Sequence, residues 1–396
     1  MFTELMVAVL LGMGIGIITG LLPGVHVNLV SVLLVTLAPS LPVAPLSLAV
    51  FIVCLGLTHT FLDAVPSIFL GAPDEDKVMA VLPGHRMLLQ GEGYQAVKLT
   101  TWGSYACLLV TLILIPLSIP ILPSLYGWIE PFMGYFLVAV ILWMILAESG
   151  MKKLWALVIF LLSGALGLTV FELPLQQPLF PMLSGLFGAS SLLLSESSKI
   201  PPQHPEKEIK LSKSMGVRTV GAGVFSGALT GLFPGLGAAQ ASVIGMALVG
   251  NIGIHGFLAL VGGIGTVNFI FSLAALYALN KARNGAIVAV MQIVGGISFL
   301  DLLILLACSL LAGSVAVMLT LWCAKRGALL LGKIDYQKVS RGILLFISVL
   351  VLLLTSWLGM LVFIVSTCVG LLAPQLEVKR SYSMGCLLVP VMLYFL

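Results

Sequence analysis

The stretch T-G-L-L-P-G, Thr19–Gly24, occurs a second time as T-G-L-F-P-G, Thr230–Gly235. The match continues outward, in the pairs Gly12 and Gly223, Gly16 and Gly227, Ser31 and Ser242, and Val32 and Val243. Proline removes a backbone donor and clashes with the preceding helical turn, and glycine permits unusual dihedral angles. Each copy therefore predicts a helix that is interrupted at its Pro-Gly.

The composition predicts a protein that spans a membrane many times. The 396 residues are 60% hydrophobic and 9% charged, with a mean hydropathy of +1.18, whereas about 25% of a soluble protein is charged. The sequence has no basic stripe with interleaved aromatic residues, so a nucleic-acid partner is not expected. The six cysteines lie singly, so neither a metal site nor a disulfide framework is expected.

Apolar stretches of roughly 17 to 25 residues mark candidate membrane spans. In the first half they lie at 5–22, 25–39, 46–70, 99–121, 131–147, 153–171 and 178–195. In the second half they lie at 217–233, 236–250, 255–279, 299–324, 342–356, 358–373 and 382–396, with a weakly apolar piece at 283–297. We therefore expect an all-α polytopic membrane protein with a first repeat over 1–195, a cytoplasmic linker over 196–216 and a second repeat over 217–396.

Basic residues predict the orientation, because Lys and Arg favour the cytoplasmic side. Loops that contain Lys and Arg in one half correspond to loops without Lys or Arg in the other half, as expected for two repeats of inverted topology. With 325–341 inside, all of the 19 Lys and Arg residues except Lys281 and Arg283 fall inside. Both termini are then predicted outside the cell membrane of a prokaryote.

Two interrupted apolar segments at matching places in two halves are a pointer to a transporter's substrate site. We expect the breaks to meet near the membrane midplane, where the helix N-termini that follow them bind an anion with backbone and hydroxyl groups. The predicted substrate-binding residues are Thr19, Gly20, Pro23, Gly24, Asn28, Ser31, Thr230, Gly231, Pro234, Gly235, Gly237, Gln240 and Ser242. The alternative is that these small residues only allow close helix packing.

The third span of each half adds polar groups. It reads T-H-T-F-L-D at Thr58–Asp63 and T-V-N-F-I-F at Thr266–Phe271, aligned with a three-residue slip. A carboxylate within a span is costly and marks an ion or proton pathway by default. Asp63, His59, Thr58 and Asn268 are the predicted coupling residues, for Na⁺ or H⁺ as the coupling ion. The alternative is that Asp63 lies at a helix end and that His59 is structural.

A polar segment follows at 74–98 and opens with three acidic residues in Pro73–Lys77. It is interpreted either as a solvated cytoplasmic cap or as a gate on the substrate path. We find no nucleophile–base pairing, no phosphate-binding loop and no H-E-x-x-H motif, so the sequence predicts a carrier and not an enzyme.

Four stretches of the chain are similar to the TctA family, the large permease subunits of tripartite tricarboxylate transporters. They are the two Pro-Gly breaks, the segment Leu70–Val97 and the ending M-G-C-L-L-V-P-V-M-L-Y-F-L, and we expect a shorter, archaeal-type branch. The resemblance implies import of di- and tricarboxylates such as citrate, driven by a cation gradient and assisted by a periplasmic binding protein and a small membrane subunit. It implies substrate contacts at Gly20, Pro23, Gly24, Gly231, Pro234 and Gly235.

Two functions remain open from the sequence. The first is a cation-coupled secondary carrier for a small organic anion that works by alternating access. The second is a translocase for an anionic lipid of the polyprenyl-phosphate type, because two inverted Pro-Gly breaks could also hold a phosphate headgroup. A homodimer is compatible with either function.

Overall fold

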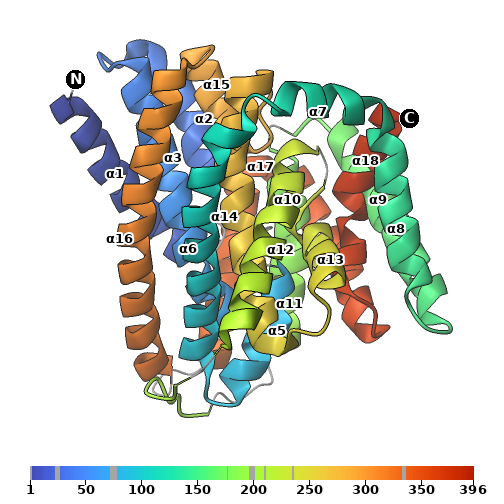
Figure 1. The fold of residues 1–396 in the computed structure, drawn as a ribbon. Helices are drawn as coiled ribbons and strands as arrows, with labels where there is room; N and C mark the ends of the chain where they lie inside the picture. The colour runs from blue at the N-terminus through green and yellow to red at the C-terminus, as the bar shows by residue number, and fades with distance from the viewer. Residues whose placement is uncertain are drawn as a thin grey trace.

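A computed structural model describes residues 2–22, 27–71, 78–175, 177–195, 201–208, 211–233, 236–331 and 336–396. These residues fold into helices, with no strand among them (Figure 1). Eight of the described helices are long and apolar enough to cross a membrane. The prediction of an all-α polytopic membrane protein is confirmed.

In the first half, α1 (Phe2–Leu21) and α2 (Val27–Leu37) lie on either side of the first Pro-Gly. The other elements are η1 (Ala38–Ser40), α3 (Pro45–Leu62), α4 (Ala64–Phe69), α5 (Val78–Leu89), α6 (Gly93–Ser118), α7 (Leu122–Ile129), η3 (Glu130–Phe132), α8 (Met133–Leu146), α9 (Lys152–Glu172), α10 (Leu179–Leu183), the π-helix η4 (Ser184–Ala189) and α11 (Ser190–Ser195). The predicted spans 99–121 and 131–147 left residues 122–130 as a connection between them, and this is wrong because α7 forms there. Proline in the first turn of α7 lacks only a donor that needs no helical partner.

The second half comprises α12 (Lys213–Leu232), α13 (Ala238–Val249), α14 (Gly253–Leu279), α15 (Gly285–Val294), α16 (Phe299–Leu331), α17 (Tyr336–Gln375), η5 (Arg380–Met384) and α18 (Gly385–Phe395). The two spans predicted at 342–356 and 358–373 both fall within α17. They are separated by Ser356, whose φ of 61° and ψ of −170° are not helical. A kink therefore joins the two segments where a loop was expected.

Glycines on α1 bring it against α3. A methyl group would lie 2.5 Å from the Phe51 carbonyl oxygen if added at Gly12, 2.6 Å from that of Leu55 at Gly16, and 3.0 Å from that of His59 at Gly20. Residue numbers rise together along this contact, so α1 and α3 run parallel. The Ala44 N–H donates to Glu4 Oε1 at 2.8 Å, which places the start of α3 beside the start of α1. Because α1 and α3 begin at the same end of the helix bundle, α2 must run back toward that end.

The second half repeats this packing between α12 and α14. A methyl group would lie 3.7 Å from the Leu260 carbonyl oxygen if added at Gly223, 2.9 Å from that of Ile264 at Gly227, and 3.0 Å from Phe271 Cβ at Gly231. Residue numbers again rise together, so α12 and α14 run parallel and α13 is the returning arm. Each Pro-Gly thus belongs to a helical hairpin that enters and leaves the bundle at one end.

The two hairpins enter from opposite ends of the molecule. Phe69, at the end of α4, shares a buried cluster with Leu258 near the start of α14. Further back along α3, a methyl group at Gly56 would lie 2.5 Å from the Phe269 ring in the middle of α14. Numbers therefore fall on one helix as they rise on the other, so α3 and α14 are antiparallel. In Figure 1, α2 lies toward the top of the bundle and α13 toward the bottom.

The polar connections gather at the lower end of the view in Figure 1, and both chain termini lie at the upper end. Within the linker, the Gln203 side chain accepts from the Gly93 N–H at 2.9 Å, and Glu206 pairs with Lys325 at 3.2 Å. These contacts join connections that the charge pattern assigns to the same side. Which end faces the cytoplasm stays a prediction.

Candidate functional site

The first Pro-Gly separates two helices, as predicted. Helix α1 ends at Leu21 and α2 begins at Val27. Pro23 and Gly24, predicted to bind substrate, lie outside the described residues, as does Pro73–Lys77 of the predicted gate. The geometry of this site is therefore built from the helix ends on either side of the break.

The end of α1 meets the predicted coupling residues of α3. Thr19 Oγ1 lies 3.1 Å from His59 Nδ1, and both side chains are buried. The Thr19 hydroxyl donates to the Gly16 carbonyl at 3.3 Å, which leaves its oxygen to accept from His59 protonated at Nδ1. Gly20 packs on the His59 carbonyl, and Thr58 lies beneath Gly16. The structure thus brings four predicted residues, Thr19, Gly20, Thr58 and His59, into one group.

Asp63 follows one turn later, at the junction of α3 and α4. It is only 5% exposed, and its backbone is helical, with φ of −59° and ψ of −21°. Its N–H donates to the His59 carbonyl at 2.9 Å, and its own carbonyl accepts from the Ser67 N–H at 3.0 Å. The acid therefore lies inside a nearly continuous 25-residue apolar span, 45–69, where an uncompensated charge is costly.

The two predicted residues on α2 have different surroundings. Asn28 faces α15, because a methyl group added to Gly285 would lie 2.4 Å from Asn28 Oδ1. Ser31 is 1% exposed, and its hydroxyl has no hydrogen-bond partner among the described residues. Asn28 therefore contributes to the contact between α2 and α15 in this conformation.

The second Pro-Gly also separates two helices. Helix α12 ends at Leu232 and α13 begins at Ala238, while Pro234 and Gly235 lie outside the part of the chain that is described. Thr230 Oγ1 donates to the Gly227 carbonyl at 2.7 Å, which is the same bond that Thr19 makes to Gly16. Gly231 packs on Phe271 as Gly20 packs on Leu62.

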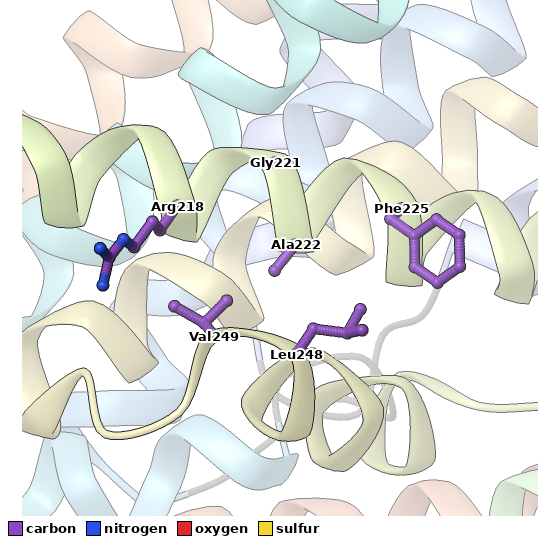
Figure 2. Close-up of a pocket in the computed structure, with 6 residues that line it drawn as sticks. All are labelled: Arg218, Gly221, Ala222, Phe225, Leu248 and Val249. Carbon is purple, nitrogen blue, oxygen red and sulfur yellow. The ribbon is translucent and has the colours of Figure 1, made fainter.

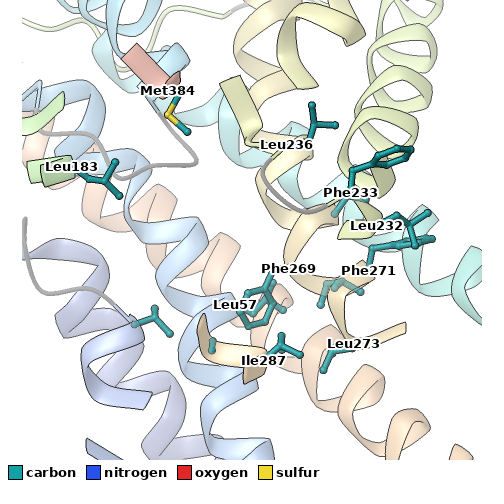
Figure 3. Close-up of a cluster of buried hydrophobic side chains, with 14 of the residues drawn as sticks. Leu57, Leu183, Leu232, Phe233, Leu236, Phe269, Phe271, Leu273, Ile287 and Met384 are labelled. Atoms are coloured by element: carbon teal, nitrogen blue, oxygen red, sulfur yellow. The ribbon is translucent and has the colours of Figure 1, made fainter. Parts of the chain in front are cut away.

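Buried apolar side chains surround this second break. Figure 3 shows Phe233 and Leu236, on either side of it, in one hydrophobic cluster with Phe269 and Phe271 of α14 and Leu57 of α3. The flanks of the second break therefore pack in the region where the third spans of both halves cross.

The contacts also correct the alignment of the third spans. Gly16 contacts Leu55 and Thr58. Gly227 makes the equivalent contacts to Ile264 and Val267, so the slip between the halves is two residues and not three. His59 then corresponds to Asn268, which is half-buried, and Asp63 corresponds to Ser272, whose hydroxyl donates to the Asn268 carbonyl at 2.7 Å. The acid and the imidazole of the first half thus have neutral counterparts in the second.

Helix α13 packs against η5, the short helix before α18. Gln240 Nε2 donates to the Ser381 carbonyl at 3.5 Å, and a methyl group at Gly237 would lie 3.0 Å from Met384 Cε. Ser242 is fully buried. Gly237 and Gln240 thus contact a segment that the sequence did not predict to belong to the site.

That segment contains Arg380, which the sequence analysis counted among cytoplasmic loop charges. Arg380 is only 7% exposed, and its Nη1 donates to Ser191 Oγ of α11. Burial lowers the pKa of Arg380 to about 10. The signal in the sequence is R-S-Y-S-M, in which three hydroxyl residues follow Arg380 directly before an apolar stretch.

An open groove with a volume of about 340 Å³ runs between α12 and α13. Figure 2 shows Arg218 at one end and Phe225 toward the other, with Ala222, Leu248 and Val249 between them. Phe225 and Leu248 are more than half exposed, so the groove opens on the outside of the bundle.

Two comparisons with known proteins find relatives of this chain. An uncharacterized protein of Methanocaldococcus jannaschii is 28% identical over 401 residues, which covers 98% of this chain and 98% of that protein. No solved structure matches the chain. The model of the tripartite tricarboxylate transporter TctA family matches residues 6–385. The chain therefore belongs to the tripartite tricarboxylate transporter TctA family.

Proposed function

We propose that this chain is a secondary carrier that imports small organic anions of the di- and tricarboxylate class, coupled to a Na⁺ or H⁺ gradient. Membership of the TctA family supports transport of such anions. By the same analogy, a periplasmic binding protein delivers the substrate and a small membrane subunit completes the complex.

The observation that carries the proposal is the pair of interrupted helical hairpins that enter from opposite ends. In carriers built from inverted repeats, discontinuous helices place backbone N–H groups toward the substrate near the membrane middle. Helices α1 and α3 run parallel, and so do α12 and α14, while α3 and α14 are antiparallel. This arrangement supports two inverted repeats and, with them, alternating access by movement of one hairpin relative to the other.

The two hairpins suggest separate roles. Asp63 is a buried acid, one turn from the His59–Thr19 contact, and so is the side chain best suited to take up a coupling cation. The second hairpin has no acid at the matching position but has hydroxyl and amide groups at Thr230 and Gln240. We therefore assign cation coupling to the first hairpin and anion binding to the second.

Uptake by the purified protein in liposomes tests the function. Labelled citrate, succinate and tricarballylate are offered under an inward Na⁺ gradient, an inward H⁺ gradient or neither, with and without the binding protein and small subunit. We expect accumulation of at least one carboxylate under one of the two gradients. Equal, gradient-independent labelling of protein-containing and protein-free liposomes, with the partners present, would contradict the proposal.

The groove between α12 and α13 favours a second candidate function, translocation of an anionic lipid carrier. A lipid translocase needs a lateral opening between spans, and Arg218 could meet a phosphate while Phe225 and Leu248 contact a chain. The same liposomes, containing a fluorescent polyprenyl phosphate, discriminate the two functions. Lipid flipping without carboxylate uptake would favour the translocase.

A further inference from the structure

Arg380 is a buried cation for which the described residues provide no counter-ion. Its only hydrogen-bond partner among the described residues is the neutral hydroxyl of Ser191, and no carboxylate of those residues lies within ion-pair distance. The adjacent Lys379 differs in this respect: its side chain is 48% exposed and pairs with Glu148 at 2.7 Å. Two consecutive basic residues therefore have opposite environments, and only Lys379 has an acidic partner.

An unpaired charge in a protein interior loses hydration that nothing replaces. Buried charges in proteins are accordingly paired or bind ligands, and a lone buried guanidinium is destabilising by several kcal/mol. Arginine also presents planar donors that match a carboxylate in a bidentate contact. Arg380 is therefore suited to bind a carboxylate group.

Further unsatisfied polar atoms lie on η5 and on α13, which contacts it. Arg380 Nε, Gln240 Oε1, Ser381 Oγ and Ser383 Oγ are all buried without a hydrogen-bond partner in the part of the chain that is described. Each of these four residues is at least nine-tenths buried. Three of them belong to the five-residue η5, and Gln240 contacts its backbone. This cluster of unsatisfied polar residues indicates a ligand site, since such groups otherwise find partners.

The neighbours also explain how the cation is held. Ser191 accepts from Arg380 and donates to the Phe187 carbonyl, so it positions the guanidinium and has no donor left for a ligand. Gln240 belongs to α13 and contacts the backbone of η5. The cluster is thereby attached to the helix that follows the second Pro-Gly.

We propose that Arg380, with the hydroxyls of Ser381 and Ser383 and the amide of Gln240, binds one carboxylate group of the transported anion. This inference rests on the proposed function and names a side chain that fixes specificity for anions. The anion leaves the Arg380 contact to Ser191 in place and accepts from two of the remaining guanidinium donors in a bidentate contact. The second hairpin then binds the substrate by a fixed charge in addition to hydroxyl and amide groups.

The test uses the purified full-length chain in detergent and two matched variants, Arg380→Met and Lys379→Met. Each removes one positive charge, and the two positions are adjacent. Melting temperature is followed as citrate, tricarballylate, inorganic phosphate and the neutral trimethyl ester of citrate are titrated at constant ionic strength. We expect the carboxylates, but not the ester, to raise the melting temperature of the wild type and of Lys379→Met.

In Arg380→Met the apparent anion affinity should fall on the order of 10- to 100-fold, the range of a charged hydrogen-bonded contact. Without anion, this variant should melt no lower than the wild type, because it loses an uncompensated buried charge. A structural arginine behaves in the opposite way: the variant melts lower and its anion response is unchanged. That result would overturn the proposal.

A conservative variant keeps the test decisive if Arg380→Met does not fold. Arg380→Lys retains the charge and loses the planar fork, so its anion affinity should lie between those of the wild type and a neutral variant. Wild-type affinity in Arg380→Lys and in Ser381→Ala/Ser383→Ala would overturn the site. If the wild type responds only to phosphate, and Arg380→Lys weakens that response, the anion site stands and the carboxylate function fails.

Discussion

The two helical hairpins have nearly the same backbone packing and opposite buried charge. In both, a glycine row lets the first arm pack on the third helix, and a threonine before the break donates to the glycine three residues earlier. The first hairpin faces His59 and, one turn on, Asp63, whereas the second has Asn268 and Ser272 at those positions and lies beside η5, which contains Arg380.

This difference shows which features the repeat requires and which it leaves free. The glycine row lets the first arm of the hairpin pack on the third helix, and the threonine donates to the carbonyl three residues earlier, near the end of that arm. Both features occur in both halves. The charged groups are not needed for that geometry, since each occurs in one half alone. We infer that they serve the two ligands of the carrier, an acid for the cation and an arginine for the anion.

The largest effect is expected at Asp63. Asp63→Asn removes the carboxylate with little change of volume, so gradient-driven carboxylate uptake should fall to the level of protein-free liposomes while the melting temperature is retained. Ser272→Ala, at the equivalent position of the second half, should leave the coupling unchanged. Unchanged gradient-driven uptake in Asp63→Asn would remove this residue from the mechanism.

Glycine-to-alanine substitutions test the glycine rows. Two of them add a methyl group where α1 or α12 touches the third helix, and one adds it where no neighbouring atom lies nearby. Gly16→Ala and Gly227→Ala place the methyl within 3 Å of neighbouring atoms of the third helix, whereas Gly14 has nothing within 4 Å. We expect both to destabilise the protein by about 1–3 kcal/mol, because a packed backbone cannot retreat easily. Gly14→Ala is the matched control and should stay within about 0.5 kcal/mol of wild type. Equal stabilities for the three variants would show that the rows do not fix the hairpins.

The His59–Thr19 contact should contribute less to the free energy of unfolding than the glycine rows do. In a double-mutant cycle, Thr19→Val and His59→Asn should give a coupling energy of about 1 kcal/mol in unfolding stability, typical of a buried hydrogen bond. Thr230→Val with Asn268→Ala serves as the control, because the side chains of Thr230 and Asn268 form no hydrogen bond with each other. An interaction energy near zero for Thr19 and His59 would mean that the first break has no specific link to the coupling residues.

The smallest effects are expected from two ion pairs that join the halves. Lys152–Glu377 is largely exposed, so Glu377→Gln should change stability by less than about 0.5 kcal/mol. Glu148 is more buried and also accepts from the Tyr382 hydroxyl at 2.9 Å, so Glu148→Gln should cost about 1 kcal/mol. A larger loss in Glu377→Gln than in Glu148→Gln would contradict this ranking.

The pH dependence of Glu148 follows from its contacts. Burial raises its pKa, but the hydrogen bonds from Lys379 and Tyr382 outweigh burial and hold the pKa below the usual carboxyl value. A group whose pKa is lowered by folding stabilises the protein above its ordinary pKa and loses that contribution as pH falls. The difference in melting temperature between wild type and Glu148→Gln should therefore persist in mild acid and shrink as the pH falls below the ordinary carboxyl pKa.

Much of the fold could be predicted because its causes are local. Apolar length marks the spans, Pro-Gly ends a helix, and the repeat of T-G-L-[LF]-P-G identifies the pair of hairpins. The sequence could not show that 122–130 is helical or that 342–373 forms one kinked helix. Both depend on how short apolar segments pack.

The candidate site was predicted less completely. Thr19, Gly20, Thr58 and His59 come together because glycines at four-residue spacing let α1 pack closely on α3. Arg380 was missed because its neighbour Lys379 made both look like loop charges, and burial arises from contacts with α11 and α13, far away in the sequence. Whether Pro23, Gly24, Pro234 and Gly235 contact substrate stays a prediction.

The division of roles between the hairpins is tested most directly by measuring citrate binding to the purified protein as a function of Na⁺ concentration and of pH. The account predicts that Arg380→Met weakens citrate binding under every condition. It predicts that Asp63→Asn still binds citrate but loses the dependence of citrate affinity on the coupling cation. Wild-type cation dependence in Asp63→Asn, or wild-type citrate affinity in Arg380→Met, would contradict it.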